Sequence, residues 1–155
     1  MREIAPHLET LPPAQRALWP RLSEVASELV LYSGTSLSLQ AGGRTSVDFD
    51  FFSHLPLDIE ELSSRYSFLY HSRLQYKALN TATFLVGGGD ESVVISFFGG
   101  PKFGRVSEPN RFADNKVLAA GLYDLSAQKD ESHPTARGSE GLPGYTQVTV
   151  IECLA

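Results

Sequence analysis

Cysteine is almost absent from this sequence, which contains only Cys153. A single cysteine excludes an intramolecular disulfide. The four histidines lie far apart in the sequence with no second thiolate nearby, so a typical structural zinc site is not expected. The sequence also lacks any run of about 18 apolar residues, the length that a membrane-spanning helix needs. We therefore expect a cytoplasmic protein that does not associate with membranes.

Basic residues are fewer than acidic ones. The chain has 13 Lys and Arg against 18 Asp and Glu, which gives a formal net charge of -5. This balance argues against binding of nucleic acid through a broad basic surface, although it is compatible with a local basic pocket. With 155 residues, of which 42% are hydrophobic and 20% charged, the composition is that of one globular domain and not of a rod or a disordered chain.

Helical and strand-like patterns alternate along the chain. Apolar spacing predicts a helix that begins near Pro12 and Pro13 and is interrupted at Trp19 and Pro20, and a later helix over 58–66. The segment 35–41 fits either a strand or a helix, and the two glycines after it favour the helix. Strands are predicted over 29–32, 46–52, 73–79, 82–86 and 92–98, and a short strand or turn that leads into a helix over 117–129.

Two aspartates lie two residues apart in the strand-like segment 46–52. Because side chains alternate along a strand, Asp48 and Asp50 should share one face while Val47, Phe49 and Phe51 take the other. Two carboxylates on one edge of a sheet suit Mg²⁺, which binds one or two carboxylates together with phosphates and water. Taken alone, such a pair is more often a solvated surface feature.

A turn of small residues precedes this pair. Ser33, Gly34, Thr35 and Ser36 follow the predicted strand 29–32 and open the predicted helix. Glycine allows the backbone to approach a ligand closely, and the first turn of a helix offers free amides to a phosphate. Together, the turn and the aspartates suggest a site for a metal-bridged triphosphate.

The run from Leu31 to Phe52 resembles the first motif of the AbiEii-type nucleotidyltransferases, within the DNA polymerase beta-like nucleotidyltransferase superfamily. In that motif a strand leads to Gly-Gly or Gly-Ser, a short helix and then Asp-x-Asp on the next strand. Here the spacing from Gly34 to Asp48 fits without an insertion. Weaker similarity continues through 94–100 and 103–106 to 122–129. The resemblance implies an α/β (α+β) fold, with a mixed twisted sheet and helices mainly on one face.

The resemblance also implies an activity. A member of this family would bind a nucleoside triphosphate (NTP) with Mg²⁺ or Mn²⁺ and transfer a nucleotidyl group to a hydroxyl acceptor. The acceptor would be RNA such as tRNA, or a protein, in a toxin-antitoxin or abortive-infection system with a cognate antitoxin as partner.

The same resemblance assigns roles to individual residues. Asp48 and Asp50 would hold the metal, while Gly34, Thr35 and Ser36 would contact phosphates through amides and hydroxyls. Lys129 would neutralise phosphate charge and, with the two aspartates, complete the catalytic set. Arg44 is a candidate phosphate contact, with a solvated loop residue as the alternative.

Two residues depart from the family pattern. Ser33 stands where relatives often carry glycine, which is tolerable if its backbone φ is negative. Ser96 stands where active members often place a third carboxylate, so Asp90, Glu91 or Asp124 would have to substitute. The alternative is a catalytically inactive nucleotide-binding remnant, or a partner-binding domain.

The C-terminal segment also departs from the pattern. Residues 1–129 are expected to form the nucleotidyltransferase-like domain, whereas 130–155 form a tail rich in glycine and proline where relatives continue as helices. We interpret this tail as the product of a frameshift just after Lys129.

Overall fold

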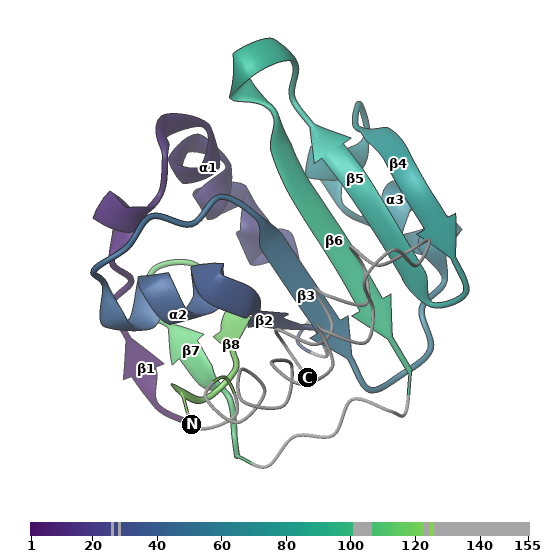
Figure 1. Cartoon of the computed structure of the whole chain (residues 1–155). Coiled ribbons are helices and arrows are strands. Elements are labelled where there is room, and N and C mark those ends of the chain that lie inside the picture. Colours follow the sequence, from purple (N-terminus) through teal and green to yellow (C-terminus); the bar gives the residue numbers. More distant parts are fainter. Residues whose placement is uncertain (26, 28, 101–106, 123–124, 126–155) are drawn as a thin grey trace, which may run out of the picture.

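The computed structural model describes residues 1–25, 27, 29–100, 107–122 and 125 (Figure 1). Its strands are β1 (Glu3–Ile4), β2 (Val30–Tyr32), β3 (Phe49–Ser53), β4 (Arg73–Ala78), β5 (Thr81–Val86), β6 (Val93–Gly99), β7 (Asn110–Phe112) and β8 (Leu118–Ala119). The helices are α1 (Pro13–Leu18), α2 (Ser33–Ala41) and α3 (Ile59–Arg65), with 3-10 turns η1 (Leu8–Thr10), η2 (Trp19–Glu24), η3 (Ser67–Leu69) and η4 (Gly89–Glu91).

The described strands form one mixed sheet in the order β1-β7-β8-β2-β3-β6-β5-β4. The pairs β1–β7, β2–β8 and β3–β6 are parallel, and the other neighbours are antiparallel. This arrangement confirms the expected mixed α/β architecture. In the part of the chain that the structure describes, no helix is long and apolar enough to cross a membrane.

The main core lies between one face of the sheet and the helices behind it in Figure 1, as expected for helices mainly on one face. Phe49 of β3 stacks on Trp19 of η2 at 6.1 Å between ring centroids, and Phe97 of β6 lies 6.4 Å from Tyr66. All four side chains are almost completely buried. Burial of such large aromatic side chains contributes about 2 kcal/mol or more each, so these contacts anchor β3 and β6 firmly.

The opposite face carries α2, which lies in front of the sheet in Figure 1. Leu37 of α2 packs against a smaller buried cluster on this face that includes Tyr32, Phe52 and Phe98. The Phe52 and Phe98 rings stack at 4.7 Å. Asp50 lies between Phe49 and Phe51, which both belong to the main core, so its side chain points to the α2 face.

Most of the predicted elements are present with shifted ends. The first helix stops being α-helical at Leu18 and continues as the 3-10 turn η2, because Pro20 cannot donate the hydrogen bond that would continue the α-helix. The helix favoured over 35–41 is confirmed as α2 and begins two residues earlier, at Ser33. Strands β1 and β7 were not predicted, since they are only two and three residues long and pair with each other across more than 100 residues.

Strand β3 begins at Phe49, three residues later than expected. The backbone just before it is held by groups outside the sheet: the amide of Ser46 donates to the carbonyl of Thr10, and Gln15 donates to the carbonyl of Val47. Val47 is consequently exposed instead of sharing the buried face of Phe49, which corrects that part of the sequence prediction.

Several expectations fall outside the described residues. These are the role of Lys129, the use of Asp124 as a substitute carboxylate, the helix that leads to 129, and the tail 130–155 with its interpretation as a frameshift.

Candidate functional site

Asp50 occupies the centre of the α2 face of the sheet. It pairs with Tyr32 of β2 on one side and with Ser96 of β6 on the other, and only 5% of it is exposed. The pKa of Asp50 is raised to about 7, mainly by burial and also by the charge of Asp48, while a hydrogen bond from the Ser33 hydroxyl acts in the opposite direction. Asp48 precedes β3 and reaches solvent, although partial burial of its carboxyl raises its pKa as well.

Ser33 forms a sharp corner between β2 and α2. The strand ends at Tyr32 and the helix begins at Ser33, so the chain changes direction with no loop residue between them. The φ of Ser33 is +73°, so the condition under which serine would replace glycine here without strain is not met. A non-glycine residue in this region costs roughly 1–2 kcal/mol, and here the hydroxyl that reaches Asp50 and accepts from the amide of Thr35 at 3.4 Å offsets part of that cost.

Arg44 folds back over the start of α2. A Cβ built on Gly34 would lie 3.6 Å from the Arg44 Nη2 atom and 3.5 Å from the Ser46 Oγ atom, so glycine leaves this approach open. A guanidinium beside the positive end of a helix dipole is electrostatically unfavourable unless an anion joins them. This placement therefore favours the phosphate-contact interpretation of Arg44 over that of a solvated loop residue.

The side chains of Thr35 and Ser36 are completely buried. The Thr35 hydroxyl bonds to the Ser46 hydroxyl at 2.7 Å and to the carbonyl of Asp48, and Ser36 accepts a hydrogen bond from Gln40. Hydroxyl contacts from these two residues to a phosphate do not fit this placement, which leaves their backbone amides as candidates. Thr35 instead fixes the segment that carries Asp48 to the first turn of α2.

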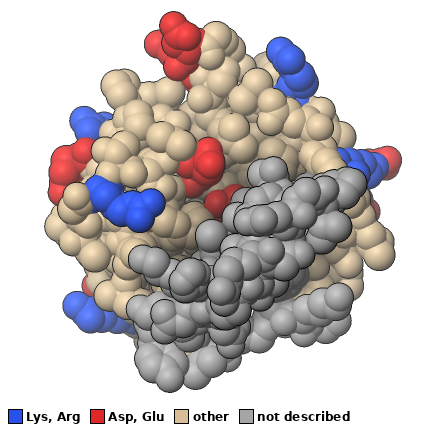
Figure 2. Space-filling model, in the orientation of Figure 1, with Lys and Arg blue, Asp and Glu red and all other residues tan. Residues whose placement is uncertain are grey.

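Figure 2 shows acidic side chains gathered near the centre of the face that carries α2, with basic side chains to one side of them. Side chains of both signs are also scattered along the rim of this view. The acidic centre with basic side chains beside it is suited to an anionic ligand that bears a cation.

Comparison with known proteins bears on the fold. A crystal structure of a "putative nucleotidyltransferase from H. pylori" superposes on 77% of this chain and 55% of its own, with a TM-score of 0.51 and 17% sequence identity. The chain has a nucleotidyltransferase-like fold. No protein-family model matches the sequence, so AbiEii-type membership stays a prediction.

A distant relative was found by sequence comparison. An uncharacterized protein of Aquifex aeolicus (strain VF5), aq_aa25, is 29% identical over 107 residues, which cover 68% of this chain and 50% of that protein. The chain thus spans about half the length of this relative and of the H. pylori protein.

The nucleotidyltransferase-like sheet places Ser96 beside Asp50, at the position expected for a third carboxylate. Ser96 is nearly buried, and its hydroxyl lies 2.9 Å from the hydroxyl of Thr83 on β5. Asp90 and Glu91 lie in the exposed turn η4 before β6, and among the described residues they form no metal-binding group of three with Asp48 and Asp50. They therefore do not substitute for the missing carboxylate, which corrects that suggestion.

The donor set for a metal is small. In the ranges that the structure describes, no group of three or more His, Cys, Asp or Glu is placed to hold a metal ion. Two carboxylates nevertheless fit Mg²⁺ in a nucleotidyltransferase-like fold, because this ion completes its coordination with phosphate oxygens and water. Asp48 and Asp50 meet that requirement.

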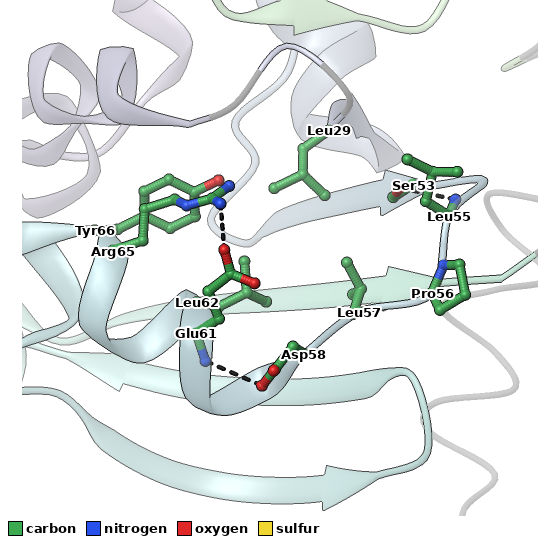
Figure 3. Close-up of a pocket in the computed structure, with 10 residues that line it drawn as sticks. All are labelled: Leu29, Ser53, Leu55, Pro56, Leu57, Asp58, Glu61, Leu62, Arg65 and Tyr66. Carbon is green, nitrogen blue, oxygen red and sulfur yellow. Dashed lines mark hydrogen bonds and ion pairs between the residues drawn. The ribbon is translucent and has the colours of Figure 1, made fainter.

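A separate cavity of about 130 Å³ opens on the helix side of the sheet, beyond the end of β3 (Figure 3). Leu29, Leu62 and Tyr66 line it, and the ion pair between Glu61 and Arg65 lies at its border. Neither aspartate of the candidate site lines this cavity.

The sequence interpretation missed two structural contributors to the site. These are the Ser33 hydroxyl, which reaches Asp50, and Ser46, which shares a hydrogen bond with Thr35. Both residues lie within the motif, but the sequence pattern does not show which side chains form hydrogen bonds across a turn.

Proposed function

We propose that the chain binds a nucleoside triphosphate with Mg²⁺ or Mn²⁺ at Asp48 and Asp50 and transfers its nucleotidyl group to a hydroxyl acceptor. The observation that carries this proposal is the carboxylate pair at the start of β3, in which the charge of Asp48 contributes to the raised pKa of Asp50. A divalent cation bound by both carboxylates would relieve their repulsion.

Other residues around the pair support the proposal. The backbone amides at the start of α2 and the Arg44 guanidinium would bind phosphate oxygens and hold the triphosphate in one orientation. Asp48 and Asp50 would hold the metal, which supplies neutralisation of phosphate charge when bound. With the triphosphate fixed in this way, an acceptor oxygen attacks the α-phosphorus in line and pyrophosphate leaves. Lys129 is proposed to contribute further positive charge.

The finer assignments are also proposals. They are AbiEii-type membership, a role as the toxin of a toxin-antitoxin or abortive-infection system, an RNA such as tRNA or a protein as acceptor, and a cognate antitoxin as partner. They derive from the resemblance of residues 31–52 to that family.

A second candidate is nucleotide binding without turnover. It is favoured by Ser96, whose hydroxyl is engaged with Thr83 and has no ionisable proton at neutral pH. In this case the Asp48 and Asp50 site would bind the Mg²⁺-NTP complex and release it unchanged.

The first test is calorimetric titration of each Mg²⁺-NTP into the full chain at about pH 8. The double variant Asp48→Ala with Asp50→Ala should lose binding, whereas Asp90→Ala with Glu91→Ala removes the same number of charges from an exposed turn and should bind normally. Equal binding by the two double variants would refute the assignment of the site.

The second test separates transfer from binding. The chain is incubated with α-³²P-labelled NTPs and total RNA or protein, and the double aspartate variant provides the background. Label above this background supports the nucleotidyltransferase. Binding without label supports the second candidate, and in that case Ser96→Asp should be tested as the change that supplies the third carboxylate.

A further inference from the structure

Strand β4 forms an outer edge of the described sheet, with α3 behind it (Figure 1). All six of its residues are nevertheless exposed, so side chains on both of its faces reach solvent. Among the described residues, half of the exposed large hydrophobic side chains fall in the ten-residue stretch around it: Tyr70, Leu74, Tyr76 and Leu79. An exposed edge with apolar side chains is a template for a further strand.

The charge of this segment is of one sign. Residues 66–89 contain Arg73, Lys77 and His71 but no Asp or Glu, although the chain as a whole carries a net charge of -5. In the ranges that the structure describes, no ion pair joins Arg73 or Lys77 to an acidic residue. Asp58 and Glu60 lie across the open groove beside Lys77 and Leu79, and Asp58 is engaged in capping α3.

These charges disfavour pairing between two copies of β4. A symmetric antiparallel pair centred on Gln75 would set Arg73 against Lys77, and other registers would set each cation against itself or an uncharged residue. Because the segment has no acidic residue, no register gives an opposite-charge pair. Charge repulsion thus disfavours pairing of β4 with a second copy of itself, whereas charge attraction favours pairing with an acidic strand.

A bulge in β4 determines on which face of the sheet each of its side chains lies, and a partner strand must match this arrangement. Pairing with β5 shifts between Leu74 and Tyr76, so Arg73 faces the same side as Leu85, whereas Lys77 faces the side of Ala82. Leu85 is only partly buried on the α2 face, and Ala82 belongs to the main core on the other face. Arg73 and Lys77 therefore lie on different faces of the sheet. The residues of β5 with which they pair, Leu85 and Ala82, are three positions apart.

We propose that β4 is a docking edge for an extended, acidic segment of a partner protein, which adds a ninth strand to the sheet. Backbone hydrogen bonds would supply the pairing, and acidic residues three positions apart would meet Arg73 and Lys77. The exposed Tyr76 and Leu74 would pack against apolar residues of the same segment, one on each face. This surface is independent of the nucleotide site proposed above.

The test uses the blocked peptide acetyl-Thr-Val-Glu-Val-Thr-Glu-Val-Thr-amide and the ¹⁵N-labelled full chain in an NMR titration. Chemical-shift changes should concentrate on Arg73–Ala78, and the same peptide with both Glu changed to Lys should bind roughly tenfold more weakly. The charge-reversed variant Arg73→Glu with Lys77→Glu should exchange these preferences. Its circular dichroism and melting temperature should be unchanged, because both side chains are exposed.

A further peptide separates strand pairing from simple charge attraction. The acidic peptide N-methylated at alternate residues keeps its charge but cannot donate along one edge, and it should not bind. Binding by this peptide, equal binding of the Glu and Lys peptides, or shifts outside β4 would overturn the proposal. Concentration-dependent dimerisation through β4, or shifts at β4 with a single-stranded oligonucleotide and none with the acidic peptide, would overturn it as well.

Discussion

The buried carboxyl of Asp50 predicts a specific dependence of stability on pH. Its pKa is about 7 in the folded chain against 3.8 for an unperturbed aspartate, mainly because of burial. The folded state therefore holds a proton that the unfolded state releases between these two values. The contribution is fully present below the unfolded pKa and is lost as the pH rises through the folded pKa.

The magnitude follows from the two pKa values. Between about pH 5 and pH 8 the free energy of unfolding should fall by about 2–3 kcal/mol because of Asp50 alone, roughly a hundredfold change in the unfolding equilibrium. The variant Asp50→Asn has no such group, so its stability relative to the wild type should increase by this amount over the same range. Any effect of the amide on packing is independent of pH and cancels in the comparison.

The assay is urea denaturation of the wild type and Asp50→Asn at several pH values, without metal, followed by circular dichroism. Asp48→Asn is the matched control, because it keeps Asp50 buried and removes only the smaller contribution of the neighbouring charge. Asp48→Asn should therefore retain most of the slope. A constant difference between the wild type and Asp50→Asn at all pH values would refute the reasoning.

Three further predictions follow from the geometry of the site and of the sheet. Ser33→Gly should be about 1 kcal/mol more stable than Ser33→Ala in urea denaturation, because both lack the hydroxyl but only glycine accepts φ +73° without strain; equal stabilities would argue against that strain. Thr35→Val keeps the shape of a buried side chain but leaves two partners unsatisfied, so it should lower the free energy of unfolding by about 1–3 kcal/mol; an unchanged value would mean that these bonds are not needed. Gly99→Ala should destabilise by more than about 1 kcal/mol, since its Cβ would lie 2.5 Å from Leu57 Cγ, whereas Gly88→Ala in open space should have a much smaller effect; similar melting temperatures for both would contradict the close packing.

The sequence predicts a helix or a strand well where its apolar residues follow a regular spacing over the whole element. Strands β4, β5 and β6 and helix α3 lie within one or two residues of their predicted bounds, because each combines a periodic pattern with clear turn residues. The end of α2 is similarly marked by Gly42, whose φ is +75° and whose amide bonds to the carbonyl of Ser38.

Other features depend on distant contacts that no local pattern encodes. The sequence places Asp48 and Asp50 on one strand, but the late start of β3 results from bonds donated by Thr35 and Gln15, which belong to other elements. The Thr35 hydroxyl likewise points inward because it donates a hydrogen bond to the carbonyl of Asp48, in a different segment of the chain. The location of Ser96 beside Asp50 was inferred through the family resemblance, and the parallel pairing of β3 with β6 confirms it.

That parallel pairing also governs how the chain reaches its native state. Strands β4, β5 and β6 form an antiparallel meander from neighbouring residues, whereas β6 can join β3 only by closing the long loop from β3 through α3, β4 and β5. Contacts between the N-terminal part and β7 close longer loops still, since the Trp19 indole N–H donates to Asp114 across 95 residues. Contacts between such distant segments slow folding, because the entropy of loop closure is lost before they can form. The meander is therefore expected to fold first, and Ser96 comes to lie beside Asp50 only when β6 docks on β3.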